Sequence, residues 1–194
     1  TYDVFDEKRH FVPGDQHDPL DVAQLGSRIG LAVCEDAWAR ELNYSVDPLT
    51  EICAGNPSVI LNPSASPWHA GKPLERRRMY AGLASDLEVP LVFVNQVGGN
   101  DELIFDGGSF ATNAHGRIIA SLPLFESAMA IVDIPGDTPG TLPHEVEEGD
   151  RVAQLEAGLT LGIRDYFSKQ SLPPGAVVGL SGGIDSAVTA YLAV

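Results

Sequence analysis

The sequence predicts an α/β fold, because short apolar runs of strand length alternate along the chain with segments that have helical periodicity. Five such runs are bounded by Gly, Pro, Asn or Asp: residues 29–33, 59–61, 91–94, 118–120 and 129–134. Strands that alternate with helices early in the chain are typical of β-α-β units, in which the strands are parallel. Antiparallel pairing is expected later in the chain.

A helix is predicted over residues 72–87, between the second and third apolar runs. Its apolar side chains recur at a spacing of four on one face: Met79, Leu83 and Leu87. Arg77 and Arg78 lie largely off this face, and Pro90 follows the end of the helix. The pattern indicates an amphipathic helix.

A hairpin is predicted next, from residues 109–112, a turn at 113–116 with the sequence NAHG, and residues 117–120. A turn of about four residues that contains glycine is typical of antiparallel strand pairs.

A change of composition predicts two domains. Residues 135–150 (PGDTPGTLPHEVEEGD) are rich in Pro, Gly, Thr and acids and have no sustained apolar period, so we interpret them as a linker. A helical stripe follows: Val152, Leu155, Leu159, Ile163 and Phe167. After a Pro-Pro-Gly break, residues 176–180 are predicted to form a buried strand. The domains are therefore residues 1–134 and the start of a second domain, residues 151–194.

The overall composition excludes several classes of protein. The chain has 194 residues and a formal net charge of −15, which argues against a nucleic-acid binder that acts through bulk charge. No apolar run approaches the ~18 residues that a membrane span needs. Two cysteines without a CxxC pair, and no signal-like start, predict a cytoplasmic protein with free thiols. Because the chain starts at Thr1 and stops within a helix-like run, we expect a fragment.

The glycine-rich segment 181–186 (SGGIDS) lies between the last predicted strand and a helix. Gly182 and Gly183 allow the backbone to approach phosphate oxygens, while Ser181 and Ser186 add hydroxyl donors near a positive helix end. Asp185 would repel a bare phosphate and therefore suggests an accompanying Mg²⁺ ion. The alternative is a simple turn with Asp185 as the helix N-cap.

The segment SGGIDSA resembles the pyrophosphate loop of the PP-loop ATP pyrophosphatase superfamily, which adopts a Rossmann-like fold. The resemblance implies that ATP is bound through its β- and γ-phosphates, with Asp185 near Mg²⁺. The residues implied in ATP binding are Ser181, Gly182, Gly183, Asp185 and Ser186.

Cys34 follows the apolar run 29–33 at the predicted end of a strand, where α/β folds expose nucleophiles. A thiol attacks strongly only as the thiolate, which a nearby cation favours. Glu35 and Asp36 oppose the thiolate, so a cation must come from elsewhere. The alternative is a buried structural cysteine, which is our interpretation of Cys53.

The block CEDAW at Cys34 resembles the nucleophile region of the nitrilase (carbon–nitrogen hydrolase) superfamily, as do three later segments: LNPSASPWHAGKPLERR, VPLVFVNQVGGNDELIFDGGSF and NAHGRIIA. The implied fold is the C-terminal part of an α-β-β-α sandwich. Together with SGGIDSA, the motifs are similar to the glutamine-dependent NAD⁺ synthetase family. The opening TYDVFDEKRHFVPGD resembles the segment after that family's catalytic Lys, and neither this Lys nor the family's catalytic Glu has a counterpart here.

This resemblance implies a role for each candidate residue. Cys34 attacks the side-chain amide of glutamine and forms a thioester, which water hydrolyses to glutamate. The remaining residues would bind glutamine: Glu35 its ammonium group, Arg77 its carboxylate, and Tyr2, Ser64 and Ser66 as pocket donors. For Arg77 the alternative is a solvated helix face. The segment 95–98 could serve either the site or a contact between subunits.

The implied reaction amidates deamido-NAD⁺ to NAD⁺, with ATP converted to AMP and pyrophosphate and ammonia supplied from glutamine. Expected partners are these small molecules, and neither nucleic acid nor a membrane; the full-length form is expected to be a homo-oligomer. Alternatives are another PP-loop glutamine amidotransferase or a non-catalytic nitrilase-like scaffold. Residues 1–194 alone are expected to be inactive, because members of a catalytic unit are absent.

Overall fold

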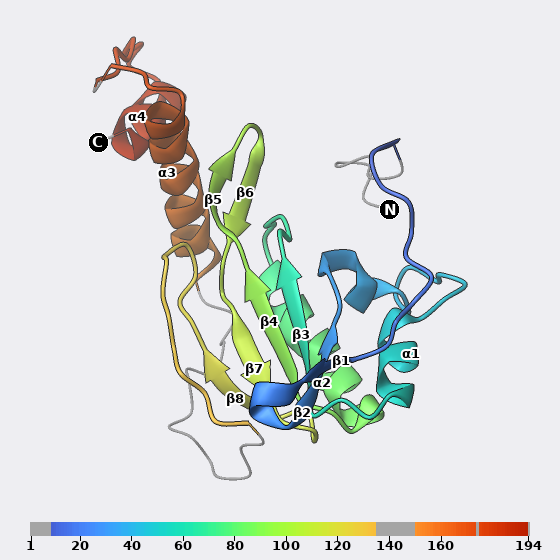
Figure 1. Ribbon diagram of the computed structural model, residues 1–194. Helices are drawn as coiled ribbons and strands as arrows, with labels where there is room; N and C mark the ends of the chain where they lie inside the picture. Colours follow the sequence, from blue (N-terminus) through green and yellow to red (C-terminus); the bar gives the residue numbers. More distant parts are fainter. Residues whose placement is uncertain (1–8, 135–149, 174, 194) are drawn as a thin grey trace.

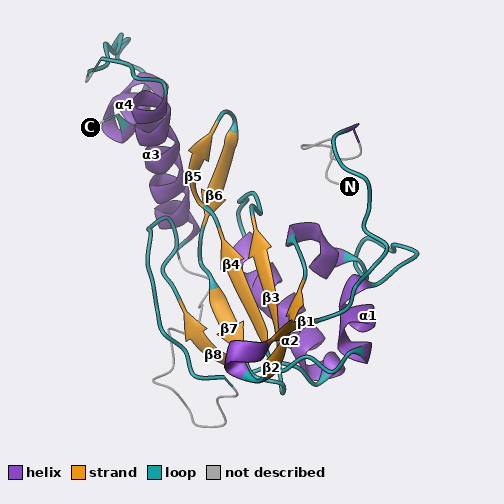
Figure 2. Cartoon of the chain, viewed as in Figure 1, coloured by secondary structure: helices purple, strands orange, loops and turns teal. Residues whose placement is uncertain are grey.

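The computed structural model describes residues 9–134, 150–173 and 175–193 and has a mixed α/β architecture (Figures 1 and 2). The main sheet has six strands in the order β1-β2-β3-β4-β7-β8. Their bounds are β1 (Leu20–Val22), β2 (Ser27–Leu31), β3 (Val59–Ser64), β4 (Leu91–Asn95), β7 (Phe110–Thr112) and β8 (Ile118–Ser121). The strands β2, β3 and β4 are parallel, and the other pairs are antiparallel.

A second, two-stranded sheet projects beyond the main sheet (Figure 1). It is the antiparallel hairpin of β5 (Val97–Asn100) and β6 (Leu103–Asp106). The helices are α1 (Pro48–Ala54), α2 (Lys72–Leu87), α3 (Arg151–Lys169) and α4 (Ile184–Leu192), with 3₁₀ turns η2 (Ala23–Leu25) and η3 (Cys34–Trp38).

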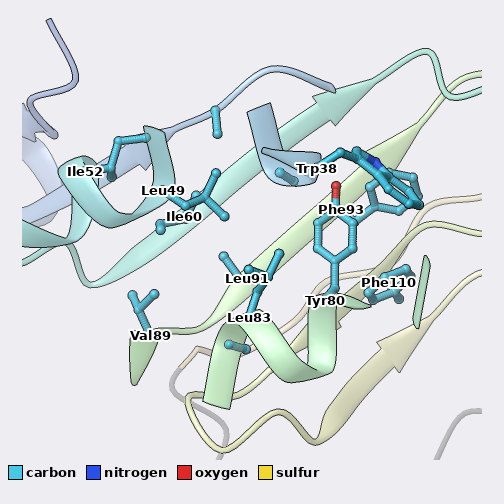
Figure 3. Close-up of a cluster of buried hydrophobic side chains, with 13 residues drawn as sticks. Trp38, Leu49, Ile52, Ile60, Tyr80, Leu83, Val89, Leu91, Phe93 and Phe110 are labelled. Atoms are coloured by element: carbon cyan, nitrogen blue, oxygen red, sulfur yellow. The ribbon is translucent and has the colours of Figure 1, made fainter. Parts of the chain in front are cut away.

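The hydrophobic core lies between one face of the main sheet and the helices α1 and α2 (Figure 3). Alternate residues of each strand point to this face, as the two-residue period of a strand requires. Tyr80 of α2 packs against Phe93 of β4 and Phe110 of β7, with ring centroids 5.0 and 5.4 Å apart. The close approach of α1 depends on Gly30, because an added Cβ would lie 2.5 Å from the Ile52 side chain.

The opposite face of the sheet also carries apolar side chains. Leu31 and Val94 point to it and are 49% and 52% exposed. One helical layer and one sheet with two apolar faces correspond to half of an α-β-β-α sandwich.

The predicted helix and hairpin are confirmed, but the buried face of the helix is wider than predicted. The helix α2 spans residues 72–87 as predicted, Leu83 is buried, and Met79 and Leu87 pack partly buried against the core. Arg77 is also buried, as is its neighbour Arg76, so the alternative of a solvated helix face for Arg77 is wrong. The hairpin forms from β7 and β8, where the side chain of Asn113 accepts hydrogen bonds from two turn amides.

Two predicted strands are absent from the described residues. Residues 129–134 and 176–180 have no strand partner there, and Met129 and Ile131 are 89% and 95% exposed. A strand needs a neighbour to pair its N–H and C=O groups, and apolar composition cannot provide one. The short strands β1, β5 and β6 were not predicted.

The helix α3 is confirmed, but it packs through Leu161 and two glycines rather than through the predicted apolar stripe. Gly158 lies against Trp68 and Phe125, and Gly162 lies against Gly99 of β5. The stripe residues Val152, Leu155 and Leu159 are exposed. The predicted linker, except for Asp150, lies outside the described residues. Within the described ranges, no helix has the length and apolar character needed to cross a membrane.

Candidate active site and phosphate loop

The candidate residues of the first domain meet at one edge of the main sheet. Because β2, β3 and β4 are parallel, their carboxyl ends lie at the same edge, which is where α/β folds place their sites. Cys34 follows β2, Ser64 ends β3 with Ser66 shortly after it, and Asn95 ends β4. The sheet therefore brings together residues that are about 30 positions apart in sequence.

Cys34 begins the short helix η3 in a left-handed backbone conformation, with φ at 46°. For a residue with a Cβ this conformation costs roughly 1–2 kcal/mol. The neighbouring turn is fixed by Asp36, whose carboxylate accepts the N–H of Val33 at 2.7 Å while its own N–H donates to the Val33 carbonyl at 3.0 Å. The thiol is partly exposed. This is a strained strand-to-helix turn of the kind that presents a nucleophile.

Two asparagines connect the ends of the parallel strands. The Asn62 amide nitrogen, on β3, donates to the backbone carbonyls of Ala32 and Cys34. The Asn95 amide oxygen accepts the N–H of Ser66 at 2.9 Å, and its nitrogen donates to the Ser66 carbonyl at 3.3 Å. The segment after β3 is thus attached to the end of β4.

Ser64 and Ser66 have different environments at this edge. The Ser64 hydroxyl donates to the Asn62 side-chain oxygen at 2.7 Å and is partly exposed. Ser66 is buried, and its Oγ has no hydrogen-bond partner among the described residues. A buried hydroxyl without a partner is costly, so this position favours an additional polar group beside it.

A buried ion pair supports Asn95 from below. The Asp106 carboxylate accepts hydrogen bonds from the Arg76 guanidinium and, at 3.2 Å, from the Asn95 amide. Burial raises the pKa of Asp106, and the adjacent Arg76 acts in the opposite direction. The pair joins α2 to the end of β6.

A second buried cation lies next to the short helix that Cys34 begins. The Nζ of Lys72 is 3.6 Å from the centroid of the Trp38 ring, at the end of η3. Burial lowers the pKa of Lys72, while Glu75, 3.5 Å away, opposes this shift. Lys72 follows the glycine that precedes α2, a position where solvent exposure would be expected from sequence.

Of the other predicted glutamine-binding residues, Glu35 lies next to Cys34 in η3, Arg77 lies apart and Tyr2 lies outside the described residues. Glu35 is partly exposed and accepts a hydrogen bond from the Tyr44 hydroxyl. Arg77 is buried, donates to the Ser121 hydroxyl on β8 and lies over Phe110, so the structure does not bring it to the Cys34 edge. Tyr2 lies outside the described residues.

Cys53 lies on α1 and packs against the hydrophobic core. Burial raises the pKa of its thiol, and Asp47 adds to this effect. The environment disfavours the thiolate, in agreement with a structural cysteine.

The segment 181–186 forms a turn directly before α4. Gly182 has φ at 85° and Gly183 is the N-cap, so the alternative that Asp185 caps the helix is wrong. The Ser186 hydroxyl accepts the N–H of Ser181 at 3.3 Å and donates to the Gly183 carbonyl at 3.0 Å. A Cβ at Gly182 would meet open space. The turn is exposed at the N-terminus of a helix, where backbone N–H groups favour an anion.

Among the residues that the structure describes, no group of three acidic, His or Cys side chains could hold a metal ion. Asp185 lies in the first turn of α4 and could provide one carboxylate. Mg²⁺ is commonly held by one or two carboxylates together with phosphate oxygens and water, so this donor set fits Mg²⁺ only when a nucleotide is bound.

Comparisons with known families match two successive parts of the chain. Residues 2–142 match the carbon–nitrogen hydrolase family, and residues 156–194 match the NAD synthase family. The predicted fold class, a nitrilase-like fold followed by the start of an NAD synthase domain, is confirmed by these matches.

Individual relatives cover the whole chain. A glutamine-dependent NAD⁺ synthetase of Synechocystis sp. is 39% identical over 100% of this chain and 36% of its own length. The structure of the glutamine-dependent NAD⁺ synthetase from Acinetobacter baumannii in complex with ADP has a TM-score of 0.86, with 38% identity over 99% of this chain and 35% of the relative.

A third similar structure covers only part of the chain. It is an amidase from Nesterenkonia sp. AN1 that carries an acetamide adduct on its active-site cysteine. It has a TM-score of 0.50 and 26% identity, over 61% of this chain and 41% of its own. The chain spans about a third of the length of the curated relatives it matches.

Proposed function

The chain belongs to the carbon–nitrogen hydrolase family, and from this premise we propose that its first domain releases ammonia from glutamine at Cys34. The observation that carries the proposal is the placement of Cys34 in a left-handed turn at the carboxyl edge of three parallel strands. Such a strained strand-to-helix turn is where α/β folds present a nucleophile, and Cys34 is partly exposed.

The proposed step is acyl transfer. The Cys34 thiolate attacks the carbonyl carbon of the glutamine amide, the C–N bond breaks, and ammonia leaves after it takes up a proton. Water then hydrolyses the thioester, which releases glutamate and restores the thiol. The resemblance assigns the proton transfer and the stabilising cation to a Glu and a Lys that have no counterpart in this chain.

The residues beside Cys34 would orient glutamine. The carboxylate of Glu35 would bind the substrate ammonium, and the hydroxyls of Ser64 and Ser66 would provide polar contacts. Support comes from the buried Ser66 hydroxyl, which has no partner among the described residues. Arg77 lacks such support, because its guanidinium contacts Ser121 and Phe110 instead.

The second domain is proposed to bind ATP through Ser181, Gly182, Gly183, Asp185 and Ser186, with Asp185 beside Mg²⁺. The Ser181 and Gly183 N–H groups donate at 3.3 Å to the Ser186 and Ser181 hydroxyls within this exposed loop, and they would exchange these long hydrogen bonds for the β- and γ-phosphates. Bound Mg²⁺ would neutralise phosphate charge as the α-phosphate is transferred.

The complete reaction proposed is that of a glutamine-dependent NAD⁺ synthetase. ATP adenylates the carboxylate of deamido-NAD⁺ and releases pyrophosphate, and ammonia displaces AMP to give NAD⁺. We propose residues 1–134 for the hydrolase domain, 135–150 for a linker and 151–194 for the start of the synthetase domain. The same resemblance predicts a cytoplasmic homo-oligomer.

The experiment that tests the hydrolase half replaces Cys34 in the full-length protein. We expect Cys34→Ala to abolish glutamine-dependent NAD⁺ formation, a loss of several orders of magnitude, and to retain formation from free ammonia. Cys53→Ala is the matched control and should retain both rates. If Cys34→Ala lost NAD⁺ formation from both glutamine and ammonia at unchanged stability, the two reactions would not take place at separate sites.

The synthetase half is tested by Asp185→Ala in the same protein. Because Asp185 is assigned to ATP and Mg²⁺, this change should reduce NAD⁺ formation from glutamine and from ammonia alike. Normal synthesis from ammonia in this variant would exclude the assignment.

A further inference from the structure

The carboxamide of Asn62 is fully buried and uses its whole hydrogen-bonding capacity at the Cys34 turn. Its nitrogen donates to the carbonyl of Ala32 at 3.1 Å and to the carbonyl of Cys34 at 3.4 Å. Its oxygen accepts the Tyr80 hydroxyl at 2.5 Å and the Ser64 hydroxyl at 2.7 Å. Two donated and two accepted bonds are all that a primary amide can make.

These four partners also fix the orientation of the amide. Both hydroxyls lie beside the amide oxygen, and both backbone carbonyls lie beside the amide nitrogen. If the amide were flipped, its oxygen would face the two carbonyl oxygens and the hydrogen bonds to them would be lost. Tyr80 comes from α2 and packs between Phe93 and Phe110, which holds its hydroxyl in place. The position of Asn62 is therefore set by the hydrophobic core.

The two carbonyls that Asn62 binds belong to Cys34 and to the residue two positions before it. Cys34 has a backbone conformation that a residue with a Cβ adopts only when its surroundings enforce it. Asp36 fixes the turn through Val33, and Asn62 fixes it from the neighbouring strand. A change at Asn62 thus affects the direction of the Cys34 backbone without touching the thiol.

We infer that Asn62 is a positioning residue for the nucleophile: it holds Cys34 in its left-handed turn and transmits the rigidity of the core, through Tyr80, to the reacting sulfur. This inference rests on the proposed hydrolysis of glutamine at Cys34. It assigns Asn62 a role through the backbone, with no contact to substrate. Tyr80 supports this role, because its hydroxyl orients the Asn62 amide.

The decisive variant is Asn62→Asp, which keeps the shape of the side chain but removes both donors. An ionised carboxylate would face two carbonyl oxygens, so the turn at Cys34 should relax. In the full-length protein we expect kcat for glutamine to fall at least tenfold, with a smaller change in KM. NAD⁺ formation from ammonia should stay within twofold of the unchanged protein.

A labelling experiment separates attack geometry from simple access. The probes are iodoacetamide and a glutamine-mimicking electrophile, and labelling of Cys34 and Cys53 is followed by mass spectrometry of their peptides. Asn62→Asp should slow labelling of Cys34 by the mimic at least tenfold and labelling by iodoacetamide less than threefold. If the mimic fails to label Cys34 preferentially in the unchanged protein, the proposed function fails rather than the role of Asn62.

Two further variants keep the inference testable if Asn62→Asp does not fold. Tyr80→Phe removes one hydroxyl that orients the amide and should lower the glutamine-dependent rate severalfold, with the ammonia-dependent rate unchanged. Thr112→Val is the matched control, because it removes buried hydrogen bonds to Leu91 at the opposite end of β4. It should lower stability without changing the ratio of the two rates.

The inference is overturned if Asn62→Asp or Tyr80→Phe lowers both rates in the same proportion, as Thr112→Val would by destabilisation. Unchanged labelling by the mimic in a folded Asn62→Asp protein would overturn it as well.

Discussion

The Arg76 guanidinium and the Asp106 carboxylate form an ion pair from which solvent is excluded, with side chains 1% and 0% exposed. The two residues are 30 positions apart, on α2 and at the end of β6. Asn95 connects the pair to the segment after β3, because its amide donates to Asp106 and accepts the N–H of Ser66.

Removing one member of this pair should destabilise the fold strongly. Asp106→Ala leaves a buried guanidinium without its counter-charge, so we expect the free energy of unfolding to fall by about 3–5 kcal/mol. Equilibrium denaturation in urea measures the change. The double variant Arg76→Met/Asp106→Leu removes both charges and should recover part of the loss. A double variant less stable than Asp106→Ala would show that packing or the Asn95 contact, and not the unpaired charge, is responsible.

The left-handed backbone at Cys34 predicts that the nucleophile costs stability. Glycine adopts φ of 46° without steric strain, whereas alanine retains the Cβ. Cys34→Gly should therefore be about 1 kcal/mol more stable than Cys34→Ala, although the greater freedom of glycine in the unfolded chain offsets part of the gain. Comparison of the two variants by thermal or chemical denaturation tests this. Equal stabilities would indicate a relaxed backbone at this position.

Docking of α3 should depend on pH through Asp165. Its carboxylate accepts the N–H of Gly99 at 2.9 Å and lies 3.3 Å from the ammonium of Lys169. Burial alone would raise the pKa of Asp165, but these two partners outweigh it and hold the pKa below its ordinary value of 3.8. A lowered pKa means that the contribution to docking is present above about pH 4 and is lost as the pH falls through the lowered pKa.

Trp68 provides the measurement for this prediction, because Gly158 of α3 lies against its ring. The chain has two tryptophans, so a Trp38→Phe background isolates the emission of Trp68. We expect a red shift in acid as α3 leaves the hairpin. Asp165→Asn should remove this pH dependence, and an identical acid transition in that variant would assign it to other carboxyl groups.

The sequence predicts those parts of the fold that depend on local pattern. The bounds of α2 follow from its apolar spacing and the nearby proline, and the β7–β8 hairpin follows from its glycine turn. Cys34 at a strand end and the turn before α4 are also local features. In each case the residues that specify the element lie within it or beside it.

Burial of charged residues could not be predicted in this way. Arg77 has the sequence pattern of a solvated face, and its partner Ser121 is 44 positions away. The partner of Arg76, Asp106, is 30 positions away. The role of Asn62 likewise depends on which strand lies beside β3. The one available signal was an asparagine within an alternating apolar strand, where a polar side chain on the buried face needs partners.

The small-residue contact between α3 and β5 also restricts how the two domains can move. A Cβ at Gly99 would lie 3.0 Å from the Cα of Gly162, and Asp165 binds the Gly99 amide one turn further along. A slide of α3 by one helical turn would place Leu161 or Lys169 where Asp165 now accepts that amide. The close approach of the two glycines and the hydrogen bond to Asp165 therefore fit only one register of α3 along β5.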